Sequence, residues 1–213
     1  MPTVPTHITV VLDRTGSMDA IRDDVIGGYN AFLAEQQKEA GQATLTLVQF
    51  DSQDPFEVVY EAVPIHRAQP LGRATFVPRA STPLYDALGR ALVSTEAHLE
   101  RLPAGARPKN VIIAVVTDGQ ENASREFTTA RVRQLLADKE KEGWTVLFLS
   151  ADLAAFEDAT SLGVADCSKM HFDATPEGTK AAFEAKSRVV LQSRRAQPSG
   201  GFTDEERKAS GGG

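Results

Sequence analysis

The sequence HITVVLDRTGSM, residues 7–18, decides the fold, because it joins a short apolar run directly to a polar loop that contains one glycine. The run His7–Leu12 is rich in β-branched residues and has the length of a strand, so it predicts a buried strand. Behind the loop, apolar side chains recur at helical spacing: Ile21, Val25, Tyr29, Phe32 and Leu33. We therefore predict a strand, a loop and a helix over 19–40 that ends at Gly41.

The rest of the chain alternates between strands and helices. Residues 44–50 and 56–65 are expected to form strands joined by a tight turn, and so short a connection favours antiparallel pairing. Residues 66–81 show no clear periodicity and are expected to form a long loop. The other predicted elements are a helix from Thr82, a strand over 111–116, a helix over 125–142, a strand over 145–149, a helix over 153–162, an edge strand over 169–172 and a helix over 176–195.

This order of elements predicts the α/β class. The expected architecture is a Rossmann-like, doubly wound and mostly parallel sheet, with one antiparallel edge hairpin and helices on both faces. The run 111–116 is the most apolar, which is typical of a central strand covered on both faces. We expect one domain over residues 1–195. Residues 196–213 are rich in Ser, Gly and charge, so they are predicted to form a disordered tail.

Composition and charge exclude several classes of function. Hydrophobic residues make up 41% of the 213 residues, which argues against a disordered chain, and the net charge of −6 lacks the basic bias of a nucleic-acid binder. The run 111–116 is too short to span a membrane, and no secretory signal is visible.

The lone Cys167 fits a reducing compartment and is expected to be a small buried or half-buried side chain. We expect a monomeric, cytoplasmic domain.

Three polar segments carry the candidate chemistry. Residues 13–17 follow the first strand, residues 117–119 follow the central strand, and residues 81–83 precede the second long helix. Ligands of open α/β sheets bind at the carboxyl ends of the strands, so we expect these segments to share one rim. Together they offer two carboxylates and three hydroxyls: Asp13, Thr15, Ser17, Thr82 and Asp118. Such oxygen ligands suit one hard divalent cation, Mg²⁺ first, with Mn²⁺ or Ca²⁺ as alternatives.

Each segment taken alone also has a structural interpretation. Asp13 and Thr15 could cap the first helix or its approach. Thr82 is a good N-cap, with Pro83 at the first helical position. The segment around Asp118 could be an ordinary turn. It is the joint occurrence of the three segments, in this order, that favours a metal site.

Neighbouring polar residues are secondary candidates. Ser81 or Thr75 could take the place of Thr82 as the hydroxyl ligand. Glu121 lies close to Asp118 in sequence and could contact the ligand side chains without binding the ion itself. Asp86, one turn into its helix, is expected to orient its neighbours rather than bind the ion.

The three segments together resemble the von Willebrand factor A domain family, in its bacterial or phage type. DRTGSM at 13–18 resembles the family's Asp-x-Ser/Thr-Gly-Ser-Met motif, TPLYDAL at 82–88 looks like its second motif, and TDG at 117–119 is similar to its third. The resemblance spans residues 6–195. It implies a metal-ion-dependent adhesion site, in which the ion is held by loop oxygens and is completed by an acidic residue of a partner protein.

The resemblance also implies a role for each residue. Thr15, Ser17 and Thr82 would coordinate the ion through their hydroxyls, and Asp13 and Asp118 would act directly or through water. The chain departs from the family pattern at two places. Thr15 replaces the commoner serine but keeps the oxygen, and RAS at 79–81 replaces the usual glycines, which predicts a stiffer loop.

The resulting hypothesis is a protein-binding module that is not an enzyme. One alternative is a metal-dependent hydrolase or phosphoesterase. It has little support, because Thr15 stands where phosphoryl-transfer enzymes with a first-strand aspartate carry a second acid, and no nucleophile elbow or phosphate loop is present. A dinucleotide site would need three glycines in the first loop. A second alternative, a metal-free interaction scaffold, predicts that divalent ions have no effect on stability or binding.

Overall fold

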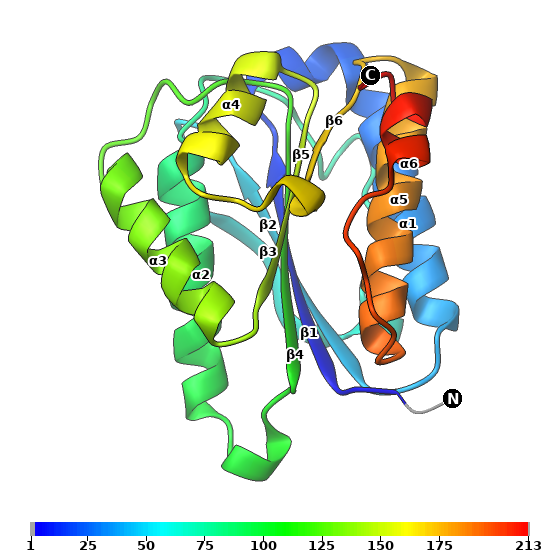
Figure 1. Cartoon of the computed structure of the whole chain (residues 1–213). Coiled ribbons are helices and arrows are strands. Elements are labelled where there is room, and N and C mark those ends of the chain that lie inside the picture. The colour runs from blue at the N-terminus through cyan, green and yellow to red at the C-terminus, as the bar shows by residue number, and fades with distance from the viewer. Residues whose placement is uncertain (1–2, 213) are drawn as a thin grey trace.

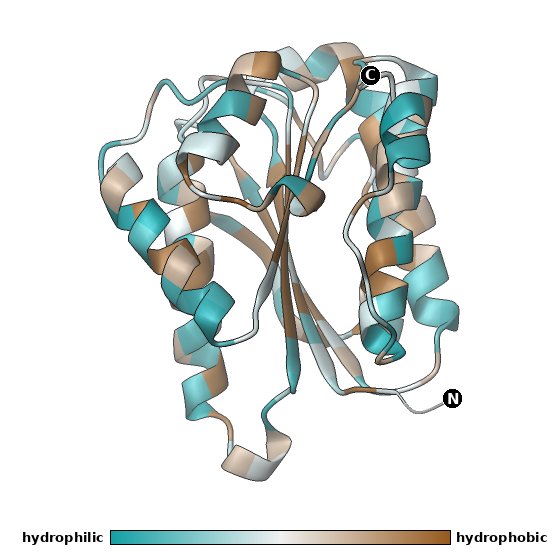
Figure 2. Cartoon of the chain, in the orientation of Figure 1, coloured by the Kyte–Doolittle hydropathy of each residue, from teal (hydrophilic) through white to brown (hydrophobic). Residues whose placement is uncertain are grey.

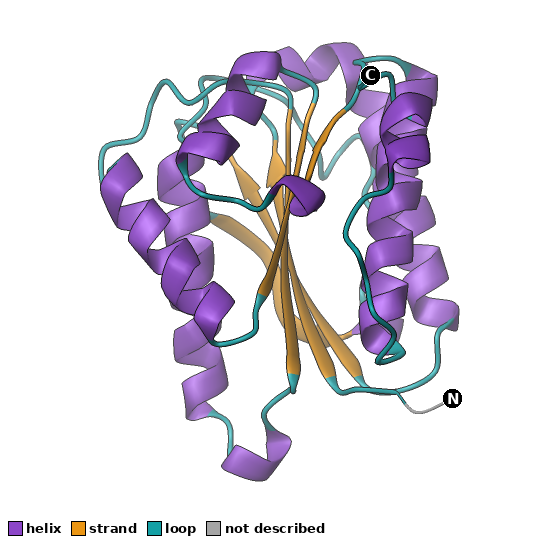
Figure 3. Ribbon diagram, viewed as in Figure 1, coloured by secondary structure: helices purple, strands orange, loops and turns teal. Residues whose placement is uncertain are grey.

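A computed structural model describes residues 3–212 as a six-stranded sheet between two layers of helices (Figures 1 and 3). The strands are β1 Thr6–Asp13, β2 Ala43–Phe50, β3 Glu57–Pro64, β4 Asn110–Thr117, β5 Thr145–Ser150 and β6 Lys169–His171. The helices are α1 Arg22–Lys38, α2 Leu84–Arg101, α3 Thr129–Lys141, α4 Leu153–Ser161, α5 Pro176–Arg194 and α6 Asp204–Ala209. Short 3₁₀ turns lie at Gly16–Ile21, Ile65–Arg67, Ala104–Ala106 and Asp166–Ser168.

The sheet confirms the predicted α/β class. Its strand order is β3-β2-β1-β4-β5-β6; β3 pairs antiparallel with β2, and the other neighbouring pairs are parallel. Figure 2 shows that the strands are largely hydrophobic, while the flanking helices carry hydrophilic residues. The chain leaves β1 and β4 toward opposite faces of the sheet. In open α/β sheets, ligands bind outside the carboxyl ends of the strands at such a position.

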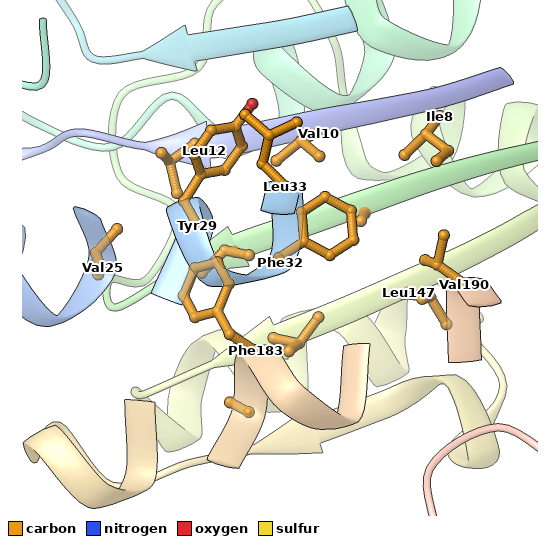
Figure 4. Close-up of a cluster of buried hydrophobic side chains, with 14 of the residues drawn as sticks. Ile8, Val10, Leu12, Val25, Tyr29, Phe32, Leu33, Leu147, Phe183 and Val190 are labelled. Atoms are coloured by element: carbon orange, nitrogen blue, oxygen red, sulfur yellow. The ribbon is translucent and has the colours of Figure 1, made fainter. Parts of the chain in front are cut away.

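Each face of the sheet has its own hydrophobic core. One core joins the sheet to α1 and α5, and the other joins it to α2, α3 and α4. Figure 4 shows Tyr29 and Phe32 of α1 beside Phe183 of α5. A Cβ atom at Gly28 would lie 2.5 Å from the Phe183 ring, so the absent side chain is what allows the two helices to approach this closely.

Two helices begin later than the sequence predicted. Pro83 occupies the N-cap position of α2, which starts at Leu84, and Thr82 makes no capping bond there; the predicted N-cap role of Thr82 is wrong. The helix predicted from Arg125 begins instead at Thr129. The cause is a long-range contact. The Asp86 carboxylate accepts hydrogen bonds from the backbone N–H groups of residues 125–127, so these residues do not form the first turn of the helix.

The C-terminal segment also differs from the prediction of disorder from residue 196 onward. Phe202 is buried, and a capping box at Thr203 starts α6. The Ser210 hydroxyl donates to the His171 carbonyl over 3.0 Å, and Gly211 forms a β-bridge with Phe172. This segment therefore covers the edge of β6. Residue 213 lies outside the described residues.

The length of the helices and the position of the cysteine bear on two of the expectations from composition. No helix within residues 3–212 combines the length and apolarity needed to cross a membrane. Cys167 is exposed, because it lies in a 3₁₀ turn at the surface, so the expectation of a buried or half-buried thiol is wrong.

Candidate metal-binding site

The two predicted carboxylates lie at the carboxyl ends of adjacent parallel strands. β1 and β4 run side by side, with Leu12 opposite Val116, so Asp13 and Thr117 reach the rim together. Asp118 follows one residue later. The first helical turn after β1 then presents Thr15 and Ser17 at the same rim. The order of the strands therefore brings Asp13 and Asp118 to one rim, and the turn after β1 adds Thr15 and Ser17.

Asp13 is fully buried at this rim. Its carboxylate accepts hydrogen bonds from the Thr15 backbone N–H at 2.7 Å and from the Thr117 hydroxyl at 2.5 Å. Burial raises the pKa of Asp13 to about 7, and the charge of Asp118 adds to this increase. The pKa of Asp118 is also raised, first by burial and then by the charge of Asp152. Both carboxylates therefore lie where a neighbouring cation would stabilise their ionised form.

Three hydroxyls converge on one point beside Gly119. A Cβ atom at Gly119 would lie 3.1 Å from the Thr82 Oγ1, 3.6 Å from the Ser17 Oγ and 3.9 Å from the Thr15 Oγ1. The Ser17 hydroxyl also donates to the Asp118 carboxylate over 2.7 Å. The missing side chain of Gly119 thus leaves a small space that three hydroxyls line, and any larger residue there would fill it.

Thr82 is held in place by the loop that follows β4. Its backbone N–H donates to the Asn122 side chain over 2.9 Å, and its carbonyl accepts from the Asn122 backbone N–H over 3.0 Å. Ser81 is exposed and lies outside the convergence at Gly119. The Thr75 hydroxyl bonds within its own turn, to Gly72. Of the three alternative hydroxyls, only Thr82 therefore reaches this space.

Asp86 and Glu121 hold the loop rather than face the hydroxyls. Asp86 accepts the three backbone N–H groups of residues 125–127. Glu121 accepts the Tyr85 backbone N–H at 2.9 Å and the Ser124 hydroxyl at 2.7 Å. Both carboxylates tie the segment after β4 to the start of α2. An orienting role was expected for Asp86 alone, and the supporting role of Glu121 stays a prediction.

Two residues that position the site were not assigned a role from the sequence. The Thr117 hydroxyl fixes Asp13, and Asn122 fixes Thr82. The only signal for Thr117 was its place directly before Asp118, and nothing local marks Asn122, which meets a residue 40 positions earlier. Arg14, between the ligand candidates Asp13 and Thr15, pairs with the buried Asp51 at 2.7 Å.

The chemistry of these donors fits a divalent cation. Two carboxylates and three hydroxyls are hard oxygen ligands of the kind that Mg²⁺, Mn²⁺ and Ca²⁺ take. No group of three or more His, Cys, Asp or Glu side chains able to hold a metal ion occurs within residues 3–212. A cation at this rim would therefore need further oxygen ligands besides the two carboxylates, from the hydroxyls or from water.

The chain is similar to known proteins in structure and not in sequence. No protein-family model matches the chain, and no curated protein shows significant sequence similarity to it. The chain is similar in structure to a von Willebrand factor type A protein from Catenulispora acidiphila, with a TM-score of 0.57 and 14% identity, covering 88% of this chain and 43% of that one.

Two other structures are also similar to the chain. One is the pilus adhesin SpaC from Lactobacillus rhamnosus GG, with a TM-score of 0.68, 13% identity and coverage of 91% of this chain and 31% of that one. The other is proximal thread matrix protein 1 from the mussel byssus, whose metal-ion-dependent adhesion site (MIDAS) motif is occupied by zinc. Its TM-score is 0.59 at 14% identity, with coverage of 89% of this chain and 46% of that one. The chain spans less than half the length of these three proteins. At such identities the likeness establishes the architecture, and the chain therefore has the fold of a von Willebrand factor type A domain.

Proposed function

We propose that this chain is a metal-dependent protein-binding module. One divalent cation, Mg²⁺ by preference, is held at the rim by five residues: Asp13, Thr15, Ser17, Thr82 and Asp118. The ion captures a Glu or Asp side chain of a partner protein. We further propose that the binding unit is a monomeric domain that includes the C-terminal segment and works in the cytoplasm.

The observation that carries this proposal is the convergence of three hydroxyls beside Gly119. They come from two segments far apart in the chain, and the loop that meets them supplies the carboxylate of Asp118. Hydrogen bonds with Thr117 and with Asn122 keep Asp13 and Thr82, respectively, in position. Several independent contacts thus hold donors around one small space, which supports a site prepared for a ligand.

The proposed metal ligands also support binding of a partner's carboxylate rather than catalysis. Neutral hydroxyls leave more of the charge of a bound ion uncompensated than carboxylates would, so a held cation would supply an open position for one further carboxylate oxygen. A hydrolase would need a base close to the reacting atoms. His7 is near the other end of β1, where it stacks on His98, and β4 and β5 separate β1 from His171 at the end of β6. The zinc-occupied MIDAS of the mussel protein supports a divalent cation at this fold's rim.

The test is thermal unfolding of the purified chain in EDTA and then with millimolar Mg²⁺, Mn²⁺, Ca²⁺ or Zn²⁺. A ligand at about a hundred times its Kd stabilises by about 2.7 kcal/mol, which is roughly 5–10 °C for a chain of this size. We expect such a shift for the wild type. Thr82→Val removes the hydroxyl but keeps the branched shape and the backbone bonds to Asn122, so the shift should disappear.

Ser81→Ala is the matched control, because it removes the neighbouring hydroxyl, which lies outside the space beside Gly119. It should keep the full cation-dependent shift. An equal loss in both variants, or no shift in the wild type with any of the four ions, would contradict the metal site and favour a metal-free scaffold. Steady hydrolysis of a generic phosphoester that is lost in Asp13→Asn would favour an enzyme instead.

A further inference from the structure

A polar groove adjoins the proposed metal site. It has a volume of about 660 Å³ and lies between α2, the loop after β2 and the loop after β4. Ser81 and Asn122 line the side nearest to Thr82: Ser81 precedes Thr82 in the chain, and Asn122 is hydrogen-bonded to it. A chain segment with one carboxylate beside Thr82 would therefore have this groove directly next to it.

The groove presents one unpaired cation. Arg90 and Arg125 both line it, but the Arg90 guanidinium forms an ion pair with Glu126 over 2.5 Å. Within the part of the chain that the structure describes, the exposed Arg125 guanidinium makes no ion pair or hydrogen bond. Its backbone is nevertheless fixed, because the Arg125 N–H donates to the buried Asp86 carboxylate over 2.8 Å. The Arg125 side chain thus lines the groove from a backbone position that a hydrogen bond holds in place.

The acids that line the groove already have partners. The Asp86 carboxylate accepts the backbone N–H groups of residues 125–127, and the Glu126 carboxylate pairs with Arg90. A carboxylate of an acidic partner segment could therefore gain an ion pair with Arg125.

We propose that the partner carries two acidic side chains, one for the metal position and a second that the Arg125 groove binds. The proposal rests on the proposed function and adds to it the class of partner, an acidic segment, and the direction in which the segment runs. Arg125 is then a specificity-determining residue that does not touch the ion. A guanidinium pairs well with a carboxylate, because its donors match the two oxygens in geometry.

The experiment uses blocked, fluorescein-labelled peptides with Mg²⁺ or Mn²⁺, and fluorescence anisotropy as the readout. One peptide has a single Glu among glycines, one has Gln in its place, and three have two Glu residues separated by one, two or three glycines. We expect at least one spacing to bind about two- to five-fold more tightly than the single-Glu peptide, the gain typical of an exposed ion pair. The Arg125 side-chain Nε–H resonance should shift with that peptide only.

Arg125→Ala should abolish this gain and leave the affinity for the single-Glu peptide unchanged. The matched control is Arg133→Ala, which removes the same charge from an exposed position on α3 and should keep the gain. No gain at any spacing, or a gain that survives in Arg125→Ala, would overturn the assignment of the groove while the metal site stands. If the single-Glu peptide binds no better than the Gln peptide, the proposed function fails and this inference fails with it.

Discussion

At the scale of single residues, Ala80 shows how the second ligand loop is shaped. Its φ of 60° lies in the left-handed region, which costs a non-glycine residue about 1–2 kcal/mol. Its carbonyl accepts the Gly16 backbone N–H over 3.1 Å. This hydrogen bond joins the loop of Thr15 and Ser17 to the loop of Thr82. Ala80 is therefore a strained residue that links two parts of the site, and the stiffness expected of the loop 79–81 stays a prediction.

Substitutions at Ala80 should reveal this strain. Ala80→Val is expected to lower the free energy of unfolding by on the order of 1–3 kcal/mol, because a β-branched side chain fits the left-handed region worse than alanine does. Ala80→Gly should change it by less than about 1 kcal/mol, since relief of strain and the greater freedom of the unfolded chain oppose each other. Urea denaturation measures both values. Ala74→Val, at an exposed loop position outside the left-handed region, is the control; an equal loss there would contradict the explanation.

The sequence could predict the donors but not the contacts that hold them. Asp13 and Asp118 follow apolar strands directly, so their shared rim was predictable from the order of strands and helices. Asn122 was not, because its partner Thr82 is brought to it only by the docking of α2 against β4. The structure brings the five proposed donors together, and their role as metal ligands stays a prediction that the thermal experiment tests.

At the scale of elements, the interface between α1 and α5 contains a fully buried lysine. Lys186 of α5 is fully buried, and its Nζ has no hydrogen-bond partner among residues 3–212. The Nζ lies 4.2 Å from the Phe32 ring centroid and 4.0 Å from that of Phe183. Ring faces favour an ammonium by about 2 kcal/mol when it is desolvated, less than the several kcal/mol that its removal from water costs. Burial accordingly lowers the pKa of Lys186 well below its ordinary value.

Lys186→Met should therefore stabilise the fold. It keeps the length of the side chain and removes a buried polar group without a partner, which costs about 1–3 kcal/mol. The folded state releases the Lys186 proton at a lower pH than the unfolded state, so the penalty shrinks as pH rises toward the unfolded pKa. We expect the gain in free energy of unfolding to be larger at pH 7 than at pH 10. Urea denaturation at both pH values measures it.

Lys180→Met on the same helix is the control, because the Lys180 side chain is 75% exposed. It should alter stability little and equally at the two pH values. A loss of stability in Lys186→Met would show that the amine has a favourable partner and would contradict this account.

The elements themselves were predictable where local signals and tertiary contacts agree. The strands β1, β2, β4 and β5 match apolar runs, since a buried parallel strand has to be apolar on both faces. The starts of α2 and α3 were not predictable. Thr82 has good capping chemistry, but its backbone is held by Asn122 instead, and the carboxylate of Asp86 takes the first amides of the expected third helix. Long-range hydrogen bonds outweighed local propensity at both positions.

At the scale of the whole molecule, the C-terminal segment joins parts that are distant in the sequence. The Arg207 guanidinium donates to the carbonyls of Lys169 and Asp166, and Arg188 of α5 pairs with Glu206 of α6. The Phe202 side chain joins the core between the sheet and α5. These contacts could not be predicted from the composition of the segment. The segment is polar and glycine-rich, and Phe202 is its one large apolar side chain.

Deletion of residues 198–213 should therefore destabilise the domain. The change exposes the surface that Phe202 covers, worth about 1.5–3 kcal/mol, and removes the hydrogen bonds to the edge of β6, while the ordering of a short segment offsets part of this. We expect a net loss of about 2 kcal/mol, or roughly 4–8 °C in Tm by calorimetry. Phe202→Ala in the full chain should reproduce most of the loss, whereas Asp204→Ala, at an exposed residue of α6, should lower Tm by much less. An unchanged Tm after deletion would support the disordered tail that the composition predicts, and would mean that β6 is stable as an open edge of the sheet.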